Sequence, residues 1–458
     1  MNALLPTSLA QIVNLRARET PDTTALLVSN KCLSYQALAI EAARLGTALA
    51  SIGVPADGIL ACAAKADDLA LATIACSWAG IPFLPLAPDT TTARWQHLRA
   101  LAPERLHRID NLPAASTRTM APAPAKADDP ALVIATSGSE GLPKAVVLSH
   151  AALAAAARNS ATAIPLRPGD AWLDCLPLNH IGGQAILWRC LSAGATVHLH
   201  NGFDAAAVWR DIAAGKASHL SLVPAMLAHL LEIADRPPPP TLRCVLVGGA
   251  ALSRLLWARA TQAGWPLHVS YGMSETAAQI TTLPPTNIWH EGLVGHPLPG
   301  TEIAIDTDGR VRIRSPQLMF GYLGAEGEDV GTENGWLRTG DLGRIGEDGA
   351  LTLLGRADDV LISAGVNIHP QEVEAQLAAC PGVFDVAVTA TPDPVWGDTL
   401  AALVVGPVEP AAIREWSRTH LPSAMHPRRF ERVASLPRNA LGKLERHALP
   451  ALLHGAAT

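Results

Sequence analysis

Long hydrophobic runs are missing from this sequence of 458 residues. No uncharged apolar stretch reaches the roughly 18 residues that a membrane-spanning helix needs. The N-terminus also lacks a basic segment followed by an apolar core, because Arg16, Arg18, Glu19 and Asp22 interrupt it. We therefore expect neither a membrane anchor nor a secretory signal.

Cysteines are scattered and form no C-x-x-C pair. They stand at positions 32, 62, 76, 175, 190, 244 and 380, and no group of His and Cys has the spacing of metal ligands. Dispersed thiols fit a reducing compartment, where they act as small buried hydrophobes. The sequence thus predicts a cytoplasmic protein without a His/Cys metal centre.

An excess of basic residues is also absent. The formal net charge is −6, which argues against a nucleic-acid-binding protein. Lysine is rare and occurs at only six positions, 31, 65, 126, 144, 216 and 443. Hydrophobic residues make up 49% and charged residues 17% of the chain, which is typical of a globular protein of two to four domains at this length.

Strand-like and helix-like segments alternate over most of the chain. Ser34 is placed to cap a helix, and residues 59–63 and 82–86 are short apolar strands. After an Ala- and Pro-rich linker at 113–130, the alternation resumes, with strands expected at 131–135, 171–176, 196–199, 219–223 and 244–247. This order predicts an α/β fold with parallel-type sheets and flanking helices.

The character of the chain changes after residue 300. Short strands at 302–305, 311–313 and 350–354 are separated by Asp-Gly pairs at 308–309 and 348–349, which are typical of hairpins. We expect a small β-barrel-like subdomain here. A further unit has a helix beginning at Pro370, so the predicted domains are 1–357 and 358–458.

The loop Thr136-Ser-Gly-Ser-Glu-Gly-Leu-Pro-Lys144 follows a predicted buried strand. Its backbone N–H groups, its hydroxyls and one lysine could bind a polyphosphate. Pro143 precedes Lys144 and Ala145 follows it, so the loop is not a Walker A sequence, and a P-loop NTPase is disfavoured. A solvated Gly/Ser turn is the alternative.

Three further motifs follow. In Tyr271-Gly-Met-Ser-Glu275, the aromatic ring could stack on a base, the glycine allows close approach, and the hydroxyl and carboxylate suit a phosphate and Mg²⁺. A helix N-cap at Ser274 is the alternative. In Arg338-Thr-Gly-Asp341 with Gly355-Arg356, the carboxylate could accept both hydroxyls of a ribose, or the pair could be a surface salt bridge. Lys443 lies in Gly-Lys near the C-terminus, where an idle solvated lysine is the alternative.

Taken in this order, the motifs resemble those of the acyl-adenylate-forming superfamily, from about residue 8 to 450. The resemblance implies an AMP-forming acid–thiol ligase with a mobile α+β C-terminal domain. ATP, Mg²⁺ and coenzyme A, or the phosphopantetheine of a carrier protein, would be its cofactors. The implied site residues are Thr136, Ser137, Gly138, Ser139 and Lys144 at the β- and γ-phosphates, Gly248, Gly249, Ala250, Tyr271 and Gly272 around the adenine, Ser274 at the α-phosphate, Glu275 with Thr136 at Mg²⁺, Asp341 and Arg356 at the ribose, Asp358 as the hinge, Gly365 near the thiol, and Lys443 as the catalytic lysine.

A finer match lies at Leu176-Pro-Leu-Asn-His-Ile-Gly-Gly-Gln-Ala-Ile-Leu-Trp-Arg189, which resembles the o-succinylbenzoate–CoA ligase family of menaquinone biosynthesis. The resemblance implies that His180 and Gly182 border the acyl group and that Arg189 helps to hold a second carboxylate. A buried arginine needs an anionic partner, and a structural ion pair is the alternative. The family often has Ser at the position of Gly182 and Phe at that of Asn179, so a different acid stays open.

Two other functions also stay open. One is an aryl or acyl carboxylate ligase that loads a carrier protein, and the other is a non-catalytic acyl-adenylate binder. The presence of Lys443 and Glu275 argues against the second. A homodimer is a family-level expectation.

Overall fold

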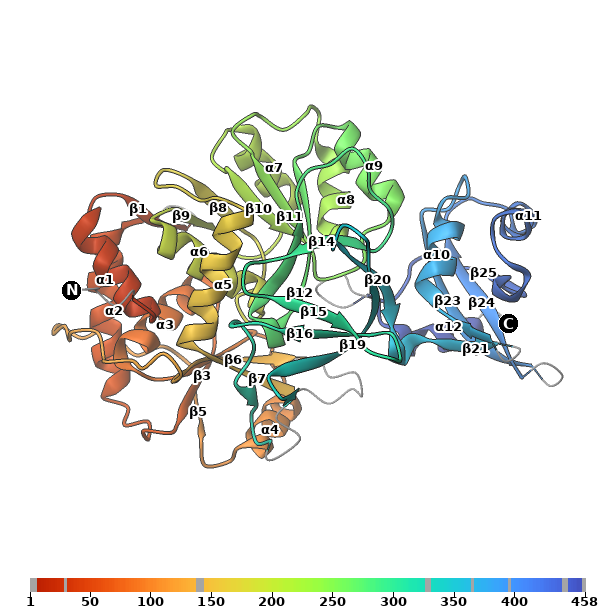
Figure 1. The fold of residues 1–458 in the computed structure, drawn as a ribbon. Coiled ribbons are helices and arrows are strands. Elements are labelled where there is room, and N and C mark those ends of the chain that lie inside the picture. The colour runs from red at the N-terminus through yellow and green to blue at the C-terminus, as the bar shows by residue number, and fades with distance from the viewer. Residues whose placement is uncertain are drawn as a thin grey trace.

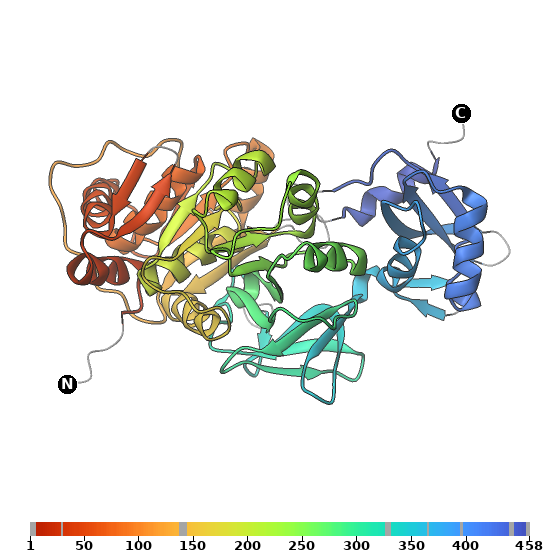
Figure 2. The same ribbon diagram turned by 90° about the horizontal axis from the view of Figure 1, so that it is seen from above.

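The computed structural model describes residues 6–28, 31–136, 144–325, 331–363, 366–393, 397–438 and 444–454. Two large sheets with helices around them make up most of the molecule, and a smaller domain follows at the C-terminal end (Figures 1 and 2). No helix of the described residues is both long and apolar enough to cross a membrane.

The larger sheet has a parallel half and an antiparallel half. In spatial order its strands are β15 (Glu302–Ile305), β16 (Arg310–Arg314), β19 (Trp336–Ile345), β20 (Leu351–Arg356), β14 (Leu293–Pro297), β13 (Ala278–Leu283), β12 (Leu267–Met273), β11 (Cys244–Val247), β10 (His219–Leu222), β8 (Ala171–Asp174), β9 (Thr196–Leu199), β1 (Thr24–Val28) and β2 (Lys31–Ser34), and β18 (Thr332–Glu333) pairs with β19. The strands from β12 to β1 run parallel, as the sequence predicts.

The antiparallel half corresponds to the predicted barrel-like subdomain. Its strands continue the parallel half as one sheet. The predicted hairpins at Asp308-Gly309 and Asp348-Gly349 are confirmed. Gly309 and Gly349 have φ of 83° and 82°, a backbone conformation that favours glycine.

The smaller sheet carries the predicted phosphate loop. Its order is β17 (Gly321–Tyr322), β7 (Lys144–Ser149), β6 (Pro130–Thr136), β4 (Phe83–Leu86), β3 (Ile59–Ala63) and β5 (Leu106–Ile109). The four strands from β6 to β5 are parallel, whereas β7 and β17 are antiparallel to their neighbours. The antiparallel return of β7 places both ends of the loop at the carboxyl end of β6.

Helices fill the space between the two sheets and cover their outer faces. Inside lie α3 (Ala66–Ala79), α5 (His150–Ala163) and α6 (Ile181–Ala193), with α1 (Leu9–Glu19) and α2 (Tyr35–Ala50) packed beside them. Outside lie α7 (Ala205–Ala213), α8 (Pro224–Ile233) and α9 (Arg254–Gln262) on the larger sheet, and α4 (Thr92–Leu101) on the smaller one. Ser34 accepts a hydrogen bond from Ala37 N and caps α2, as predicted.

The C-terminal part has hydrophobic clusters of its own. Its elements are the 3₁₀ turn Ala357–Asp359, β21 (Leu361–Ser363), β22 (Val366–Ile368), α10 (Pro370–Ala378), β23 (Asp385–Asp393), β24 (Gly397–Val405), α11 (Pro410–His420), the turn Ser423–Met425, β25 (Arg429–Arg432), the turn Arg446–Ala448 and α12 (Leu449–His454). Pro370 begins α10, in the position where a missing N–H costs least.

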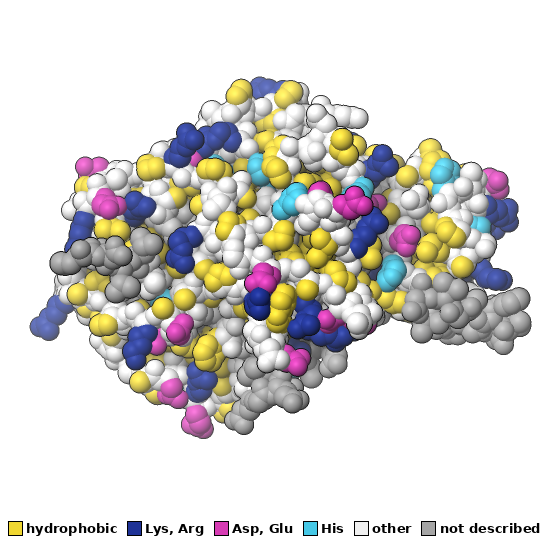
Figure 3. Space-filling view, viewed as in Figure 1, with side chains coloured by type: hydrophobic (Ala, Val, Ile, Leu, Met, Phe, Trp, Pro, Cys, Tyr) yellow, Lys and Arg dark blue, Asp and Glu magenta, His cyan; other side chains and the backbone are white. Residues whose placement is uncertain are grey.

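Acidic and basic side chains are interspersed over the face shown in Figure 3, and neither sign forms a continuous patch there. This distribution agrees with the modest negative net charge and gives that face no electrostatic footprint for nucleic acid.

Buried histidines predict how stability depends on pH. Burial lowers the pKa of His150, His180 and His219 to about 4 from the ordinary 6.5. The unfolded chain therefore binds more protons between these values, and the unfolding free energy should fall as the pH drops from 6.5 to 4, by up to about 1.4 kcal/mol per pH unit for each histidine. Urea denaturation across this range measures the slope. His219→Gln should flatten it and replacement of the exposed His420 should not, and an equal slope in all three proteins would contradict the assignment.

Candidate functional site

The two ends of the predicted phosphate loop meet at the edge of the smaller sheet. Thr136 ends β6 and Lys144 begins β7, the two are cross-strand partners, and Thr136 Oγ1 donates to Lys144 O at 3.4 Å. Ser137, Gly138 and Ser139 lie outside the described residues. Ligands of parallel sheets bind beyond the carboxyl ends of strands, which is where Thr136 stands.

Lys144 is linked to Glu275 through a tyrosine. Its Nζ lies 5.1 Å from the centre of the Tyr322 ring, and the Tyr322 hydroxyl donates to Glu275 Oε1 at 3.0 Å. Tyr322 stands on β17, which pairs with β7, whereas Glu275 follows β12 of the other sheet. The tyrosine thus joins the predicted phosphate cation to the predicted metal ligand across the two sheets. Burial and the Glu275 charge raise the pKa of Tyr322, which keeps its hydroxyl a donor.

A second set of contacts leads from β12 to the C-terminal domain. The Tyr271 hydroxyl donates to Asp341 Oδ2 at 2.6 Å, and Arg356 lies 3.6 Å from Asp341 Oδ1. Asp341 and Arg356 are partners across β19 and β20, so the hairpin fixes their proximity. Burial, followed by the Asp341 charge, raises the pKa of Tyr271 well above its usual value, so the phenol stays protonated and holds the carboxylate in place.

The predicted hinge is the next residue in this set of contacts. Asp358 is 3.5 Å from Arg356 and 3.9 Å from Arg310, and it is half exposed. A cavity of about 360 Å³ lies beside this turn. Its lining includes Ala357 and Val360, which flank residues 358–359, and also Arg310 and His369. The side chains around Asp358 are therefore held by polar contacts beside open space. Gly365 and Lys443 lie outside the described residues.

The turn after β12 differs from the predicted alternative. Ser274–Thr276 is a single 3₁₀ turn that leads into β13, so the alternative of a helix capped by Ser274 is wrong. Thr276 is fully buried and its Oγ1 contacts Met273 O at 3.1 Å and Ala278 O at 2.7 Å. It holds Ala277 and Ala278 at φ of 48° and 85°, and such strain is concentrated at functional sites.

Glycines among the residues predicted to surround the adenine allow close backbone contacts. A Cβ at Gly272 would overlap the Ala278 carbonyl oxygen, so no other residue fits this bulge. A Cβ at Gly248 would come within 2.7 Å of Ser270 Oγ, and Gly249 has φ of 78°. Gly248, Gly249 and Ala250 follow β11 directly, at the same carboxyl edge as Tyr271.

The predicted acyl-site residues belong to one helix, α6. His180 is its N-cap residue and its side chain makes no cap hydrogen bond. Burial, with Arg94 adding to it, lowers the pKa of His180 to about 4, so the imidazole is neutral at pH 7. A Cβ at Gly182 would meet only the end of the Leu176 side chain, at 3.1 Å.

Arg189 is buried without an ion-pair partner among the described residues. Its Nη2 donates to the neutral amide oxygen of Gln279 at 3.1 Å, and the guanidinium lies 5.2 Å from the centre of the Trp172 ring. The buried carboxyl group of Asp174 interacts with Arg189 electrostatically without forming an ion pair at contact distance, so the alternative of a structural partner stays open. Burial lowers the pKa of Arg189 to about 10, so it is still charged at pH 7.

Sequence reasoning missed three residues of these contacts, Tyr322, Gln279 and Trp172. A usable signal existed for the first, because the chain has only three tyrosines and two of them, Tyr271 and Tyr322, hold carboxylates here. Gln279 and Trp172 carried no such signal, since their role follows from the packing of β8, β13 and α6.

Most of this chain is similar in sequence to known proteins. Residues 100–323 match the AMP-binding enzyme model and residues 372–443 match the AMP-binding enzyme C-terminal domain. The chain is 32% identical to a 2-succinylbenzoate–CoA ligase of Listeria monocytogenes over 95% of its length and 97% of that protein. It is 38% identical to the enzyme of the same name from Bacillus licheniformis over 70% of each chain.

Solved structures agree. The o-succinylbenzoate coenzyme A synthetase of Bacillus subtilis, in complex with ATP and magnesium ion, superposes with a TM-score of 0.87 at 30% identity, covering 96% of this chain and 99% of that one. The same protein in complex with its acyl-adenylate intermediate superposes with a TM-score of 0.86 over 96% and 97% of the two chains.

Proposed function

Since the chain belongs to the AMP-binding enzyme family, we propose that it is an AMP-forming ligase that joins 2-succinylbenzoate to coenzyme A in menaquinone biosynthesis. The acid's carboxylate attacks the α-phosphorus of ATP and pyrophosphate leaves. The thiol of coenzyme A then attacks the acyl-adenylate and AMP leaves. The observation that carries the proposal is the pair of contact sets that meet at β12 and the turn after it. One joins Lys144 to Glu275 through Tyr322, and the other joins Tyr271 to Asp341, Arg356 and Asp358. The chain also aligns with a 2-succinylbenzoate–CoA ligase over 95% of its length.

The described residues suit the three parts of ATP. Lys144 and the Thr136 hydroxyl would hold the pyrophosphate that leaves. Asp341, fixed by Tyr271 and Arg356, would accept the two ribose hydroxyls. Little covalent work is left to the protein, because holding the carboxylate in line and stabilising charge on the phosphate oxygens account for most of such a reaction.

Glu275 fits a magnesium ion. Tyr322 occupies Oε1 of Glu275, so the carboxylate is oriented and Oε2 remains for a hard cation, which prefers oxygen ligands. The Thr136 hydroxyl would be a second oxygen ligand. When bound, Mg²⁺ neutralises charge that develops on the phosphate oxygens.

Tyr322→Phe tests this orientation. Loss of the hydroxyl frees Glu275 Oε1 and should raise the Mg²⁺ concentration that half-saturates pyrophosphate exchange by about 10-fold, because partners of metal ligands typically affect metal affinity by 10–100-fold. Tyr35→Phe is the control: its fully buried hydroxyl donates to Ala195 O at 2.7 Å, outside the site. It should cost stability and leave the Mg²⁺ dependence unchanged. Equal Mg²⁺ dependence in wild type and Tyr322→Phe would contradict the role.

Arg189 supports a dicarboxylic acid. Among the described residues its guanidinium has a neutral hydrogen-bond partner and an aromatic face, and no carboxylate within ion-pair distance. A substrate carboxylate would give it a direct partner, and 2-succinylbenzoate has a second carboxylate to offer. The neutral His180 at the start of the same helix would border the acyl group. At Gly182, where the family often has Ser, a serine side chain would need the end of the Leu176 side chain to shift slightly.

The second half-reaction needs a rearranged C-terminal domain. We propose that residues 358–458 rotate about Asp358, which would move Lys443 away and admit the thiol. A homodimer and a cytoplasmic location remain predictions.

A carboxylic-acid panel tests the choice of acid and acceptor. Pyrophosphate release is measured with ATP and Mg²⁺ for 2-succinylbenzoate, benzoate and linear acids, first alone and then with coenzyme A or with a phosphopantetheinylated carrier protein. We expect 2-succinylbenzoate to be preferred and turnover to follow coenzyme A. Turnover of simple aryl acids with the carrier protein only would favour the carrier-loading alternative. Absence of pyrophosphate exchange with every acid would favour a non-catalytic binder.

A further inference from the structure

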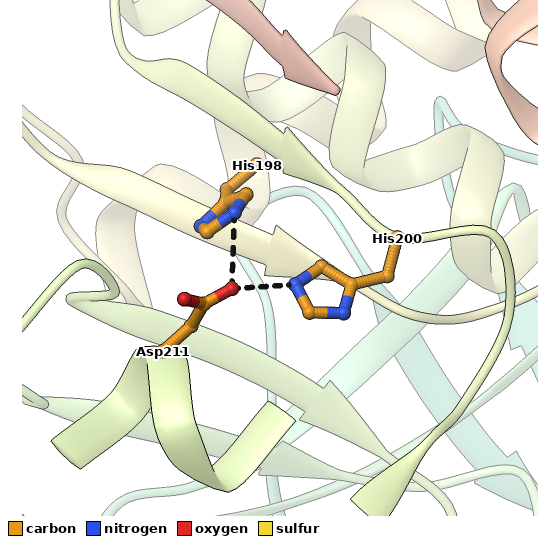
Figure 4. A group of neighbouring side chains, drawn as sticks. All are labelled: His198, His200 and Asp211. Carbon is orange, nitrogen blue, oxygen red and sulfur yellow. Dashed lines mark hydrogen bonds and ion pairs between the residues drawn. The ribbon is translucent and has the colours of Figure 1, made fainter. Parts of the chain in front are cut away.

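Two histidines and an aspartate come together on the larger sheet (Figure 4). None of the three is among the residues assigned to ATP or to the acid. His198 stands on β9 and His200 directly follows it, and residues two apart on a strand share a face. Asp211 reaches them from α7. A search of the sequence for His and Cys at metal-ligand spacing could not find this group, because its third residue is an aspartate on a helix.

The two distances from the histidines to Asp211 are those of a tetrahedral site, and all three ligand atoms lie within 4.8 Å of one another. His198 Nε2 and His200 Nε2 lie 3.4 Å and 3.1 Å from the same oxygen, Asp211 Oδ2. Zn–N and Zn–O distances of roughly 2.0–2.2 Å in a tetrahedron separate neighbouring ligands by about 3.3 Å. Both separations are close to this value without any movement of the side chains.

His198 has the weaker contact with the shared carboxylate. The residue is 5% exposed, and its Nε2 lies farther from Asp211 Oδ2 than that of His200. A cation bound to both ring nitrogens and to the carboxylate would satisfy the Nε2 atoms of the two histidines alike.

We propose that His198, His200 and Asp211 bind a divalent transition-metal ion of the Zn²⁺ class. The ligand set is two imidazoles and one carboxylate, with water in the fourth position. The ion joins the end of β9 to α7 and so fastens an outer helix to the sheet. This site is separate from that of Mg²⁺, which prefers oxygen ligands.

Lys216 distinguishes the metal site from a simple ion-pair network. Its Nζ lies 2.9 Å from the other carboxylate oxygen, Asp211 Oδ1, and its side chain is 56% exposed. In an ion-pair network this ammonium is a favourable partner of Asp211. Beside a bound cation it is a like charge, and its removal should therefore tighten metal binding.

Titration with Co²⁺ in excess Mg²⁺ tests the proposal, because tetrahedral Co²⁺ has visible ligand-field absorption. The wild type should bind one equivalent with this spectrum, and Zn²⁺ should displace it and raise the melting temperature. His200→Ala and Asp211→Asn should weaken binding at least 100-fold, since removing a direct ligand exceeds the 10–100-fold effect of an outer partner. Their pyrophosphate exchange should persist, which reports that they are folded.

The controls separate this site from the other histidines of the chain. His290→Ala, at an exposed histidine outside the cluster, should bind Co²⁺ as the wild type does. Lys216→Ala should bind it more tightly. The proposal is overturned if the wild type shows no saturable tetrahedral Co²⁺ spectrum, if His200→Ala and Asp211→Asn bind Co²⁺ as the wild type does, or if Lys216→Ala binds it less tightly.

Discussion

Lys443→Ala should slow formation of the acyl-adenylate by at least about 10²–10³-fold, the cost of removing one group that stabilises developing charge. The carboxylate and the polyphosphate are both anions, so their approach needs a cation, and Lys443 is the one that the resemblance assigns. The second half-reaction is different, because the lysine must leave before the thiol enters. Synthetic acyl-adenylate and coenzyme A should therefore give the thioester at a nearly unchanged rate in Lys443→Ala.

The two half-reactions are measured separately, by isotope exchange between pyrophosphate and ATP and by thioester formation from supplied adenylate. Lys126→Ala is a suitable control, because it removes an exposed lysine of the surface linker. Pyrophosphate exchange at an unchanged rate in Lys443→Ala would contradict the role of Lys443 in forming the acyl-adenylate. Equal losses in both half-reactions would indicate a structural defect.

Arg189→Met should lower kcat/KM for 2-succinylbenzoate by about 10²-fold or more. The variant leaves a substrate carboxylate without its buried cation, a loss of about 3 kcal/mol or more for a desolvated charge pair. Methionine keeps much of the side-chain volume, and no carboxylate of the described residues forms an ion pair with Arg189 that the substitution would break. The melting temperature of the variant checks that it is folded, because the buried Asp174 interacts electrostatically with Arg189.

An analogue in which the succinyl carboxylate is replaced by a carboxamide gives the matched comparison. Its kcat/KM should change little between wild type and Arg189→Met. Arg243→Met is the control variant, because Arg243 pairs with Asp170 at 2.5 Å and is half exposed, away from the site. If Arg189→Met affects both acids equally, Arg189 supports the fold and does not select the acid.

The fold followed from the sequence wherever local signals and tertiary packing agree. Apolar runs bounded by turns predicted the parallel strands β8 to β11, Ser34 and Pro370 marked the starts of α2 and α10, and Asp-Gly pairs marked two hairpins. Two of the motifs also lie in contact, because the Tyr271 hydroxyl donates to Asp341; that they surround a nucleotide stays a prediction.

Other features depend on pairings that no local pattern carries. Serine is a common helix-capping residue, yet Ser274 begins a short turn. The buried Thr276 hydroxyl donates to Ala278 O and stabilises that turn, which leads into β13. The link from Lys144 to Glu275 requires β17 to pair with β7, which brings Tyr322 from far along the chain. The neutral partner of Arg189 and the cluster of His198, His200 and Asp211 arise in the same way, from the packing of helices on sheets.

The products of a single reaction test the central claim most directly. The purified protein is mixed with ATP, Mg²⁺, 2-succinylbenzoate and coenzyme A, and the products are identified by chromatography and mass spectrometry. We predict AMP, pyrophosphate and the 2-succinylbenzoyl thioester of coenzyme A in equal amounts, with the acyl-adenylate accumulating when coenzyme A is left out. ADP with phosphate, or AMP without the thioester, would contradict the assignment.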